Sequence, residues 1–383
     1  MPGSSLRICY LLAYFHPIAS GAERQALAQG AELVRRGHAV RVVTQEVPGS
    51  GLPRDETIRG VLVHRWVKPV RAGPLFGLTF VAGVVRALHR LRGTYDLIHT
   101  HQGLWESIAT GAARAVIDVP TLVQPASSGY FGEAEEMART KGFPALRRLA
   151  LRNTAFAAIS EDIERQWLAL GVPPDTMHRM CSGVETDRFH PGASAVEGTL
   201  PPGPRVLFTG RLHPQKNLDL LLDAWAEVAR RRPDAQLILL GDGPDRDRLA
   251  SKAAGLGLGD RVHFPGAVED PSEYLRAADV FVLPSVAEGM SNSLLEAMAT
   301  GLPCIASAIG GNTDLLAPGP SGLLVPPDDR SGWAEAILRV LEDRPFARSL
   351  GTSALEAIRQ QYDMRVVVDR YVELYQSLLR GGS

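Results

Sequence analysis

The chain has 383 residues, and its 41 basic and 42 acidic side chains give a net charge of −1 at pH 7. That balance excludes a strongly basic nucleic-acid-binding surface, and the length predicts two or three domains. Three cysteines lie far apart in apolar stretches and favour free thiols in a reducing compartment, and no apolar run is long enough to span a bilayer. We therefore expect a soluble, cytoplasmic protein.

Buried strands and amphipathic helices alternate through the first 190 residues. The run Leu6–Ala13 is continuously apolar, as is typical of a strand covered on both faces, and a helical pattern follows it and stops at Gly37. Further strands are expected at 38–44, 60–66, 95–100, 120–123, 155–159 and 177–182, and further helices at 75–91, 104–116 and 143–152. Residues 125–145 interrupt this βαβ rhythm with a Ser-, Gly- and Glu-rich loop. The pattern predicts a doubly wound parallel sheet.

Residues 191–204 are rich in Pro, Gly, Ala and Ser without periodicity, which indicates a linker. Beyond it, strands are expected at 205–209, 235–240, 262–264, 279–283, 303–307 and 322–325, and helices at 218–231, 246–254, 272–277 and 333–341. Residues 365–383 predict a closing helix that packs back on the first domain. We expect two Rossmann-like domains, 1–190 and 205–364, facing across a cleft, with ligands at the carboxyl ends of the strands.

The most informative stretch runs from Glu288 to Glu296. The strand before it ends at Pro284, so Glu288 lies on the loop that leaves the carboxyl end of that strand. Residues 291–293, Ser-Asn-Ser, compete for the N-cap of the next helix, whose N-terminus attracts phosphates. Glu296 lies about one turn into this helix. An anion-binding position between two carboxylates suits a phosphorylated, hydroxyl-rich ligand such as a nucleotide sugar.

Two cations follow the first strand of the second half. Arg211 and Lys216 stand five positions apart on one loop, where a guanidinium fork and an ammonium can together neutralise a diphosphate. Lysine is scarce in this chain, which draws attention to Lys216. A solvated basic loop is the alternative interpretation of these two residues.

Two short segments partly match sequence motifs of other ligand-binding sites. The segment from Gly241 to Arg246 begins like a dinucleotide-binding fingerprint, but Arg246 stands in the place of the third glycine. Asp245 and Asp247 match an Asp-x-Asp metal motif, although acids are common in the first turn of a helix for dipole reasons. We infer that neither a metal nor a cofactor is required.

Taken together, these motifs resemble glycosyltransferase family 4, whose members have the GT-B fold and retain anomeric configuration. The matching segments, in chain order, are Ser20-Gly21-Ala22-Glu23, Gly183-Val184-Glu185 with Phe189 and Pro191, Gly210-Arg211 with Lys216-Asn217, and Glu288 with Glu296. Two positions depart from the family pattern: Ser20 replaces the first glycine of a Gly-Gly loop, and Asp314 stands where Glu is usual. The resemblance implies transfer of a sugar from a nucleotide-sugar donor to an acceptor hydroxyl without a metal.

The resemblance also implies roles for individual residues. Arg211 and Lys216 would bind the donor diphosphate, Glu288 would bond hydroxyls of the transferred sugar, and Glu296 would bond the ribose. His101, at the end of the strand 95–100, would face the donor sugar and complete the catalytic set. The other donor-binding residues implied are Gly21, Gly210, Val268, Gly289, Met290, Ser291, Asn292 and Ser293.

The sequence says least about the acceptor, which we expect on the first domain near His16, Ser127 and Ser128. A glycan, a lipid-linked molecule and a small metabolite all remain open. The segment from Lys141 to Arg152 interleaves basic and apolar residues. This pattern fits either a helix that packs on the sheet with a solvated basic face or a helix that lies on an anionic membrane.

Two other functions fit the same fold. One is another GT-B enzyme: an epimerase would release free nucleotide without an acceptor, and a glycoside phosphorylase would respond to orthophosphate. The other is a non-catalytic protein that binds sugar nucleotides. Such a protein typically lacks one member of the Arg/Lys/Glu/Glu set, and none is lost here.

Overall fold

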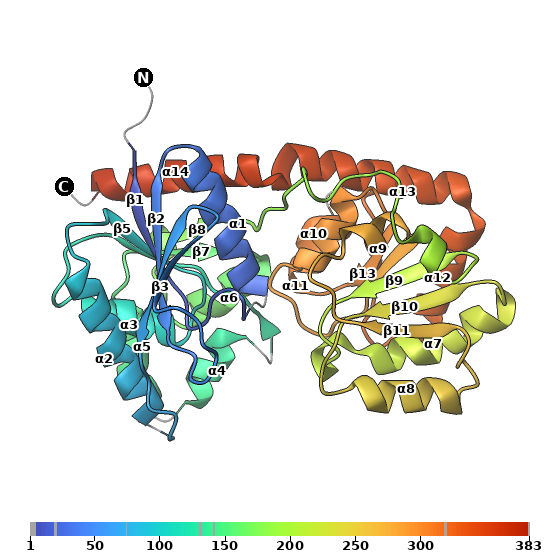
Figure 1. Ribbon diagram of the computed structural model, residues 1–383, viewed down its shortest axis with the longest axis horizontal. Helices are drawn as coiled ribbons and strands as arrows, with labels where there is room; N and C mark the ends of the chain where they lie inside the picture. Colours follow the sequence, from blue (N-terminus) through green and yellow to red (C-terminus); the bar gives the residue numbers. More distant parts are fainter. Residues whose placement is uncertain are drawn as a thin grey trace. The chain divides into compact units, whose positions relative to one another are not determined.

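The structure, a computed structural model, describes residues 5–18, 21–73, 75–129, 132–140, 142–317 and 320–381. The chain divides into two compact units: unit 1 comprises residues 1–183 and 364–383, and unit 2 comprises 184–363. Each unit contains one sheet with helices on its faces (Figure 1). The segment 191–204, expected as a linker, lies within unit 2, where the Ala195 N–H donates to Glu273 Oε2 at 2.7 Å.

The sheet of unit 1 has the strand order β3-β4-β2-β1-β5-β6-β7-β8, and all neighbours are parallel except β3 and β4. Its strands are β1 (Arg7–Leu11), β2 (Ala39–Gln45), β3 (Asp55–Ile58), β4 (Val61–Val67), β5 (Leu97–Thr100), β6 (Thr121–Val123), β7 (Ala155–Ala158) and β8 (Met177–Arg179). The chain winds in one direction from β1 and in the other from β5. The switch point of this sheet therefore lies between β1 and β5.

Strand β3 was not expected, and it makes the sheet mixed. It forms a hairpin with β4 through Arg59 and Gly60, which have φ angles of +50° and +83°. Two positive φ values in a two-residue connection are typical of a hairpin turn whose twist matches the strands. Its residues are mostly polar and at least partly exposed, so no apolar pattern marked β3 in the sequence.

The helices of unit 1 are α1 (Gly21–Arg35), α2 (Leu75–Arg90), α3 (Trp105–Ala113), α4 (Glu133–Arg139), α5 (Phe143–Ala150), α6 (Glu161–Ala169) and α14 (Met364–Gly381). Leu11, Val43, Phe80 and Ala109 share one buried core between the sheet and helices α2 and α3. Helix α4 lies inside the expected loop 125–145 and is a correction to it. It buries only two apolar side chains, too few to show a helical period.

Unit 2 contains a six-stranded parallel sheet in the order β11-β10-β9-β12-β13-β14. Its strands are β9 (Arg205–Thr209), β10 (Gln236–Leu240), β11 (Val262–Gly266), β12 (Val280–Leu283), β13 (Cys304–Ser307) and β14 (Leu323–Val325). Its helices are α7 (Leu218–Arg231), α8 (Arg246–Gly255), α9 (Ser272–Arg276), α10 (Asn292–Ala299), α11 (Gly310–Leu316), α12 (Arg330–Glu342) and α13 (Arg344–Ala357), and a π-helical turn follows at Ile358–Tyr362. The winding reverses between β9 and β12, which is the switch point of this sheet.

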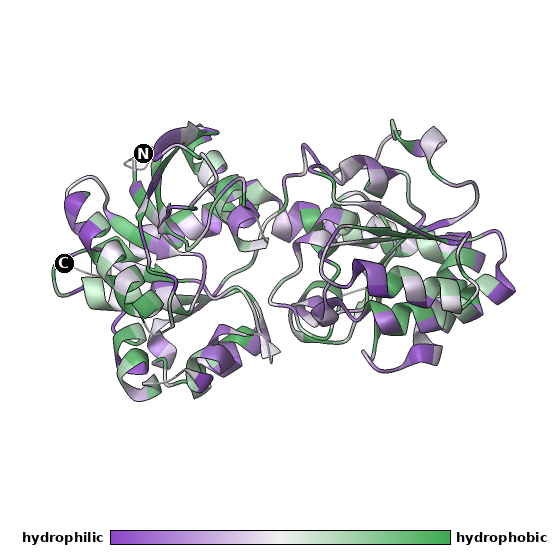
Figure 2. Ribbon diagram, turned by 60° about the horizontal axis from the view of Figure 1, so that its bottom comes forward, coloured by the Kyte–Doolittle hydropathy of each residue, from purple (hydrophilic) through white to green (hydrophobic). Residues whose placement is uncertain are grey.

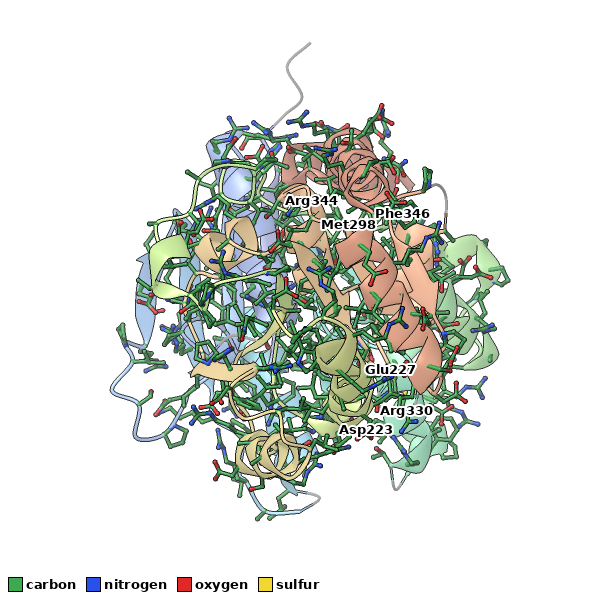
Figure 3. All side chains as sticks on the ribbon, turned by 90° about the vertical axis from the view of Figure 1, so that its right-hand side faces the viewer. Asp223, Glu227, Met298, Arg330, Arg344 and Phe346 are labelled. Carbon is green, nitrogen blue, oxygen red and sulfur yellow. The ribbon has the colours of Figure 1, made fainter. Side chains whose placement is uncertain are left out.

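The central strands of both sheets are predominantly hydrophobic, whereas the helices carry both hydrophilic and hydrophobic residues (Figure 2). Strands buried on both faces need such continuous apolar runs, which is why their positions could be predicted. In unit 2, helix α7, with Asp223 and Glu227, lies beside α12, whose first residue is Arg330 (Figure 3). No helix in the described ranges is long and apolar enough to cross a membrane.

Candidate functional site

Two loops meet at the switch point of unit 2. Strands β9 and β12 are parallel neighbours, so the loops that leave their carboxyl ends emerge side by side. The loops are joined by two hydrogen bonds: the Val286 N–H donates to Gln215 O at 2.9 Å, and Gln215 Nε2 donates to Ala287 O at 2.8 Å. The cation-bearing loop and the loop that carries Glu288 therefore form one structural unit.

The central contact of this unit is the ion pair between Lys216 and Glu288. Their Nζ and Oε1 atoms are 2.5 Å apart, and the two side chains are only 17% and 9% exposed. Asn217, the next residue, adopts a left-handed conformation and donates from Nδ2 to Pro327 O, which anchors the end of the loop. A poorly solvated ammonium held in one position interacts more strongly with a bound anion than a freely moving surface lysine does.

Helix α10 begins beside this ion pair, and Ser291 is its N-cap. Ser291 Oγ accepts a hydrogen bond from Leu294 N at 3.4 Å and lies 3.0 Å from Ser293 Oγ. Met290, Ser293 and Glu296 are all less than 10% exposed. The positive end of the helix macrodipole thus lies next to Lys216 and Glu288, as an anion-binding site requires.

Two other predicted donor-site residues lie at the surface of unit 2. Arg211 is exposed, so its guanidinium is accessible to a ligand from solvent. Val268, just beyond β11, is 38% exposed. Gly210 has a φ of +153° and donates its N–H to Leu240 O. The structure joins Lys216, Glu288 and the start of α10.

The glycines that imitate a dinucleotide fingerprint have a packing role. A Cβ on Gly241 would lie 1.9 Å from Gly210 O, and a Cβ on Gly243 would lie 2.3 Å from Leu212 O. The Leu212 N–H also donates to Asp242 O at 2.9 Å. These glycines let the loop after β10 support the backbone of the loop that carries Arg211.

The Asp-x-Asp pattern is likewise explained by an ion pair. Arg248 bonds Asp219 at 2.6 Å and Asp245 at 3.0 Å, so Asp245 is engaged in a surface ion-pair network. Within the ranges that the structure describes, no three His, Cys, Asp or Glu side chains converge as metal ligands would.

At the switch point of unit 1, Ala13 links three elements. Its N–H donates to Glu106 Oε1 at 2.9 Å, and its carbonyl accepts from Thr44 Oγ1 at 3.0 Å. His16 follows on the same loop, and its carbonyl accepts from Arg65 Nη2 at 2.6 Å. Glu106 was missed by the sequence reasoning because a glutamate in the first turn of a helix is usually a solvated dipole partner.

His101, which follows β5, is buried next to the same switch point. Its ring centroid lies 4.1 Å from that of His99 and 4.4 Å from that of Tyr10. Burial, and then the proximity of His99, hold the pKa of His101 well below its usual value, so the imidazole is neutral. Both of its ring nitrogens are buried, and neither has a hydrogen-bond partner in the described structure, which is unusual for buried polar atoms.

The acceptor-side serines lie on the loop after β6. Glu133 accepts hydrogen bonds from the N–H groups of Ala126 and Ser127 and from Ser127 Oγ, at 2.8, 2.9 and 3.0 Å. Ser128 is 2% exposed. The buried Glu133 carboxylate therefore fixes the loop, and the Ser127 hydroxyl is already engaged within it.

The burial of the Glu106 side chain leads to a pH-dependent stability. Burial, and secondarily the nearby carboxyl groups of Glu133 and Glu23, raise the pKa of Glu106 to about 7 from 4.5. The folded state then holds a proton that the unfolded state releases, so the free energy of unfolding falls as pH rises from 5 to 8, by about 2–3 kcal/mol. Urea unfolding of wild type and Glu106→Gln at both pH values should show a change with pH that is more unfavourable in wild type by about this amount, because the other buried groups titrate alike in both proteins. Parallel pH dependence in the two proteins would contradict it.

Two predicted features lie partly outside the described residues. Ser20 and Lys141 are not among the described residues, but Gly21 is the first residue of α1. Within the basic segment, Arg147 Nε donates to Leu170 O at 2.5 Å and its guanidinium packs against Gly171, whereas Arg148 is exposed. At least one of the basic residues thus stabilises unit 1 itself.

Comparison with known proteins matches both parts of the chain. The model of Glycosyltransferase Family 4 matches residues 19–188, and that of Glycosyl transferases group 1 matches residues 203–343. D-inositol 3-phosphate glycosyltransferase from Nocardia farcinica is 31% identical, over 91% of this chain and 84% of its own length.

Solved structures agree with this match. Sucrose-phosphate synthase from Thermosynechococcus elongatus superposes with a TM-score of 0.83 at 27% identity, over 98% of this chain and 99% of its own. Anabaena HepE in complex with UDP and glucose has a TM-score of 0.80 at 22% identity, over 97% and 100% of the two chains, and shows the shared fold alone.

Proposed function

Because this chain belongs to glycosyltransferase family 4 and is a glycosyltransferase of the GT-B type, we propose that it retains anomeric configuration and uses a nucleotide-sugar donor without a metal. The observation that supports the donor most directly is the Lys216–Glu288 pair beside the start of α10. In that arrangement a cation, a carboxylate and a helix N-terminus lie together at the switch point of unit 2. A diphosphate linked to a sugar needs all three.

The proposed division of labour follows from charge. Lys216, Arg211 and the N-terminus of α10 stabilise the diphosphate as it departs, and so supply the positive potential that a divalent cation supplies in other transferases. Glu288 binds hydroxyls of the transferred sugar, and Glu296 binds the ribose. The backbone of Gly289, Met290, Ser291, Asn292 and Ser293 holds the phosphates and sugar, and Gly210, Val268 and Gly21 complete the donor contacts.

Retention is proposed to proceed by attack on the face from which the diphosphate leaves. The bond between the anomeric carbon and the phosphate oxygen breaks, the acceptor oxygen bonds to the same carbon, and the acceptor proton passes to the departing phosphate. No protein base is then needed. His101, neutral and without a hydrogen-bond partner in the described structure, is proposed to bond the donor sugar through a ring nitrogen.

The acceptor is proposed to bind unit 1 near His16, Ser127 and Ser128. The named relative from Nocardia farcinica suggests a small polyol phosphate as one acceptor to test. A lipid-linked acceptor, with peripheral contact to an anionic membrane, and a glycan are the other classes. The buried free thiols Cys9, Cys181 and Cys304 favour work in a reducing compartment such as the cytoplasm.

The test of this function is a thermal-shift titration with UDP, GDP, ADP and dTDP. A ligand that binds only the folded protein stabilises it by about 2.7 kcal/mol at one hundred times its dissociation constant. We expect one nucleotide to raise the melting temperature of wild type and to have a smaller effect on Glu296→Ala. Glu227→Ala is the control, because Glu227 lies on α7 and its ion pairs with other described residues are loose, at 3.9 and 4.0 Å (Figure 3).

The outcomes separate the alternatives. Selective stabilisation by one nucleotide identifies the donor base, and radiolabelled sugar transfer from that donor then distinguishes a transferase from an epimerase. The absence of any shift with all four nucleotides would refute the nucleotide-sugar proposal and favour a phosphorylase, which responds to orthophosphate. Transfer that continues in excess EDTA is expected, because the cations are residues of the chain itself.

A further inference from the structure

The C-terminal helix α14 places two tyrosines against the strand that leads to His101. Helix α14 lies in unit 1 and packs against α1 (Figure 1). The side chains of Tyr371 and Tyr375 are 1% and 0% exposed. The Tyr371 ring stacks on the His99 ring at 5.4 Å, and the Tyr375 ring meets it edge-on at 5.7 Å. Helix α14, which begins more than 260 residues after His101 in the sequence, thus packs directly on His99, two residues before His101.

Hydrogen bonds in this cluster define the state of His99. Its Nδ1 lies 2.7 Å from the Tyr375 hydroxyl, and its Nε2 lies 3.1 Å from Gln124 Oε1. The Tyr371 hydroxyl donates to the same Gln124 oxygen at 2.6 Å. An amide oxygen only accepts, so His99 Nε2 must carry the proton, and Nδ1 must accept from the Tyr375 hydroxyl.

Burial keeps both partners in these states. It lowers the pKa of His99 to about 3, so the ring is neutral at any working pH. Burial also raises the pKa of Tyr375 well above its usual value, so its hydroxyl remains a donor. The cluster therefore holds His99 in one tautomer and one ring plane.

The His101 ring depends on this arrangement. Its two nitrogens have no hydrogen-bond partner in the part of the chain that the structure describes, so packing rather than hydrogen bonding sets its orientation, and the rings of His99 and Tyr10 are part of that packing. The His101 and His99 rings have centroids 4.1 Å apart and an interplanar angle of 32°. The Tyr10 ring packs edge-on against the His101 ring, with centroids 4.4 Å apart. A rotation of the His99 ring would change the position of the His101 nitrogens.

We propose that Tyr375 is a positioning residue for His101: its hydroxyl, donated to His99 Nδ1, fixes the ring against which the His101 imidazole packs. This inference rests on the proposed function, in which His101 bonds the donor sugar. It assigns to the C-terminal helix a role in the reaction in addition to its role in folding.

The test compares Tyr375→Phe with Tyr95→Phe. Tyr95 is the matched control, because it is also a buried tyrosine of unit 1, 3% exposed, and its hydroxyl donates to Leu88 O at 2.9 Å, outside the cluster around His99. Both variants lose one buried hydroxyl and should show similar falls in melting temperature. We expect kcat to fall about tenfold in Tyr375→Phe, with KM for the donor nearly unchanged, and to stay within about twofold in Tyr95→Phe.

A second measurement does not depend on activity. The imidazole ¹⁵N shifts of wild type should report His99 protonated on Nε2, and Tyr375→Phe should change the signals of both His99 and His101. Equal kcat losses in the two variants, unchanged His101 signals, or a wild-type His99 protonated on Nδ1 would each overturn the proposal. If wild type transfers no sugar from any nucleotide donor, the proposed function fails, whereas the ¹⁵N comparison still decides whether Tyr375 positions His101.

Discussion

Replacement of Lys216 by alanine is expected to lower kcat/KM for the donor by about 10²–10³-fold, the usual effect of removing one preorganised group that stabilises developing charge. The Lys216 ammonium is 17% exposed and is held 2.5 Å from Glu288, so it needs little rearrangement when the diphosphate departs. Most of the loss should appear in kcat, because charge on the leaving phosphate grows toward the transition state.

Lys252→Ala is the matched control for this variant. Lys252 lies in the same unit, is 27% exposed and also forms an ion pair, at 2.8 Å to Asp223. Its removal should leave kcat/KM within about twofold, since an exposed ion pair contributes at most about 1 kcal/mol to stability and Lys252 lies outside the proposed site. Similar kinetic losses in the two variants would refute the role of Lys216. The Lys216 variant removes the ammonium that Glu288 contacts, and the loss of one partner of a buried ion pair can destabilise the fold. Melting temperatures and nucleotide titrations of both variants would therefore show whether any loss of activity comes from unfolding.

The second large effect is expected for Gly311→Ala, at the start of α11. A Cβ at this position would lie 1.8 Å from Gly289 O and 2.9 Å from Met290 Cα, which are backbone atoms of the loop before α10. Backbone cannot move aside as a side chain can, so the loop that carries Gly289 and Met290 must shift relative to α11. We expect activity to fall about 10²-fold through misplacement of the donor, with about 1–3 kcal/mol of destabilisation from overpacking.

Gly255→Ala is the control for this change. Gly255 is the last residue of α8, and a Cβ there would meet nothing within 4 Å. Alanine favours a helix over glycine, so this variant should be as stable as wild type or slightly more stable, with unchanged activity. Thermal-shift titration with the nucleotide that binds wild type should show a weakened response in Gly311→Ala only. Wild-type kinetics in Gly311→Ala would mean that the loop before α10 does not hold the donor.

Much of the fold could be predicted because its elements are marked by local patterns. Strand β9 and helix α7 coincide with the expected ranges 205–209 and 218–231, because an apolar run and a helical period bound each of them. The N-cap at Ser291 was one of three possibilities, and the structure decides among them through the bond from Leu294 N. The elements that were missed are the short β3, α4, α6 and α11 and the 14-residue helix α13.

The amino-acid sequence by itself determined the alternation of strands and helices, the family and the order of the site motifs, since each depends on residues close together in the chain. Only the tertiary structure decided which distant groups meet. It joined Lys216 to Glu288, Ala13 to Glu106 and Tyr375 to His99, contacts that span 72 to 276 positions. Such pairings follow from strand order and from the packing of a terminal helix. Burial then sets the protonation states of the buried groups, and no local pattern encodes burial of this kind.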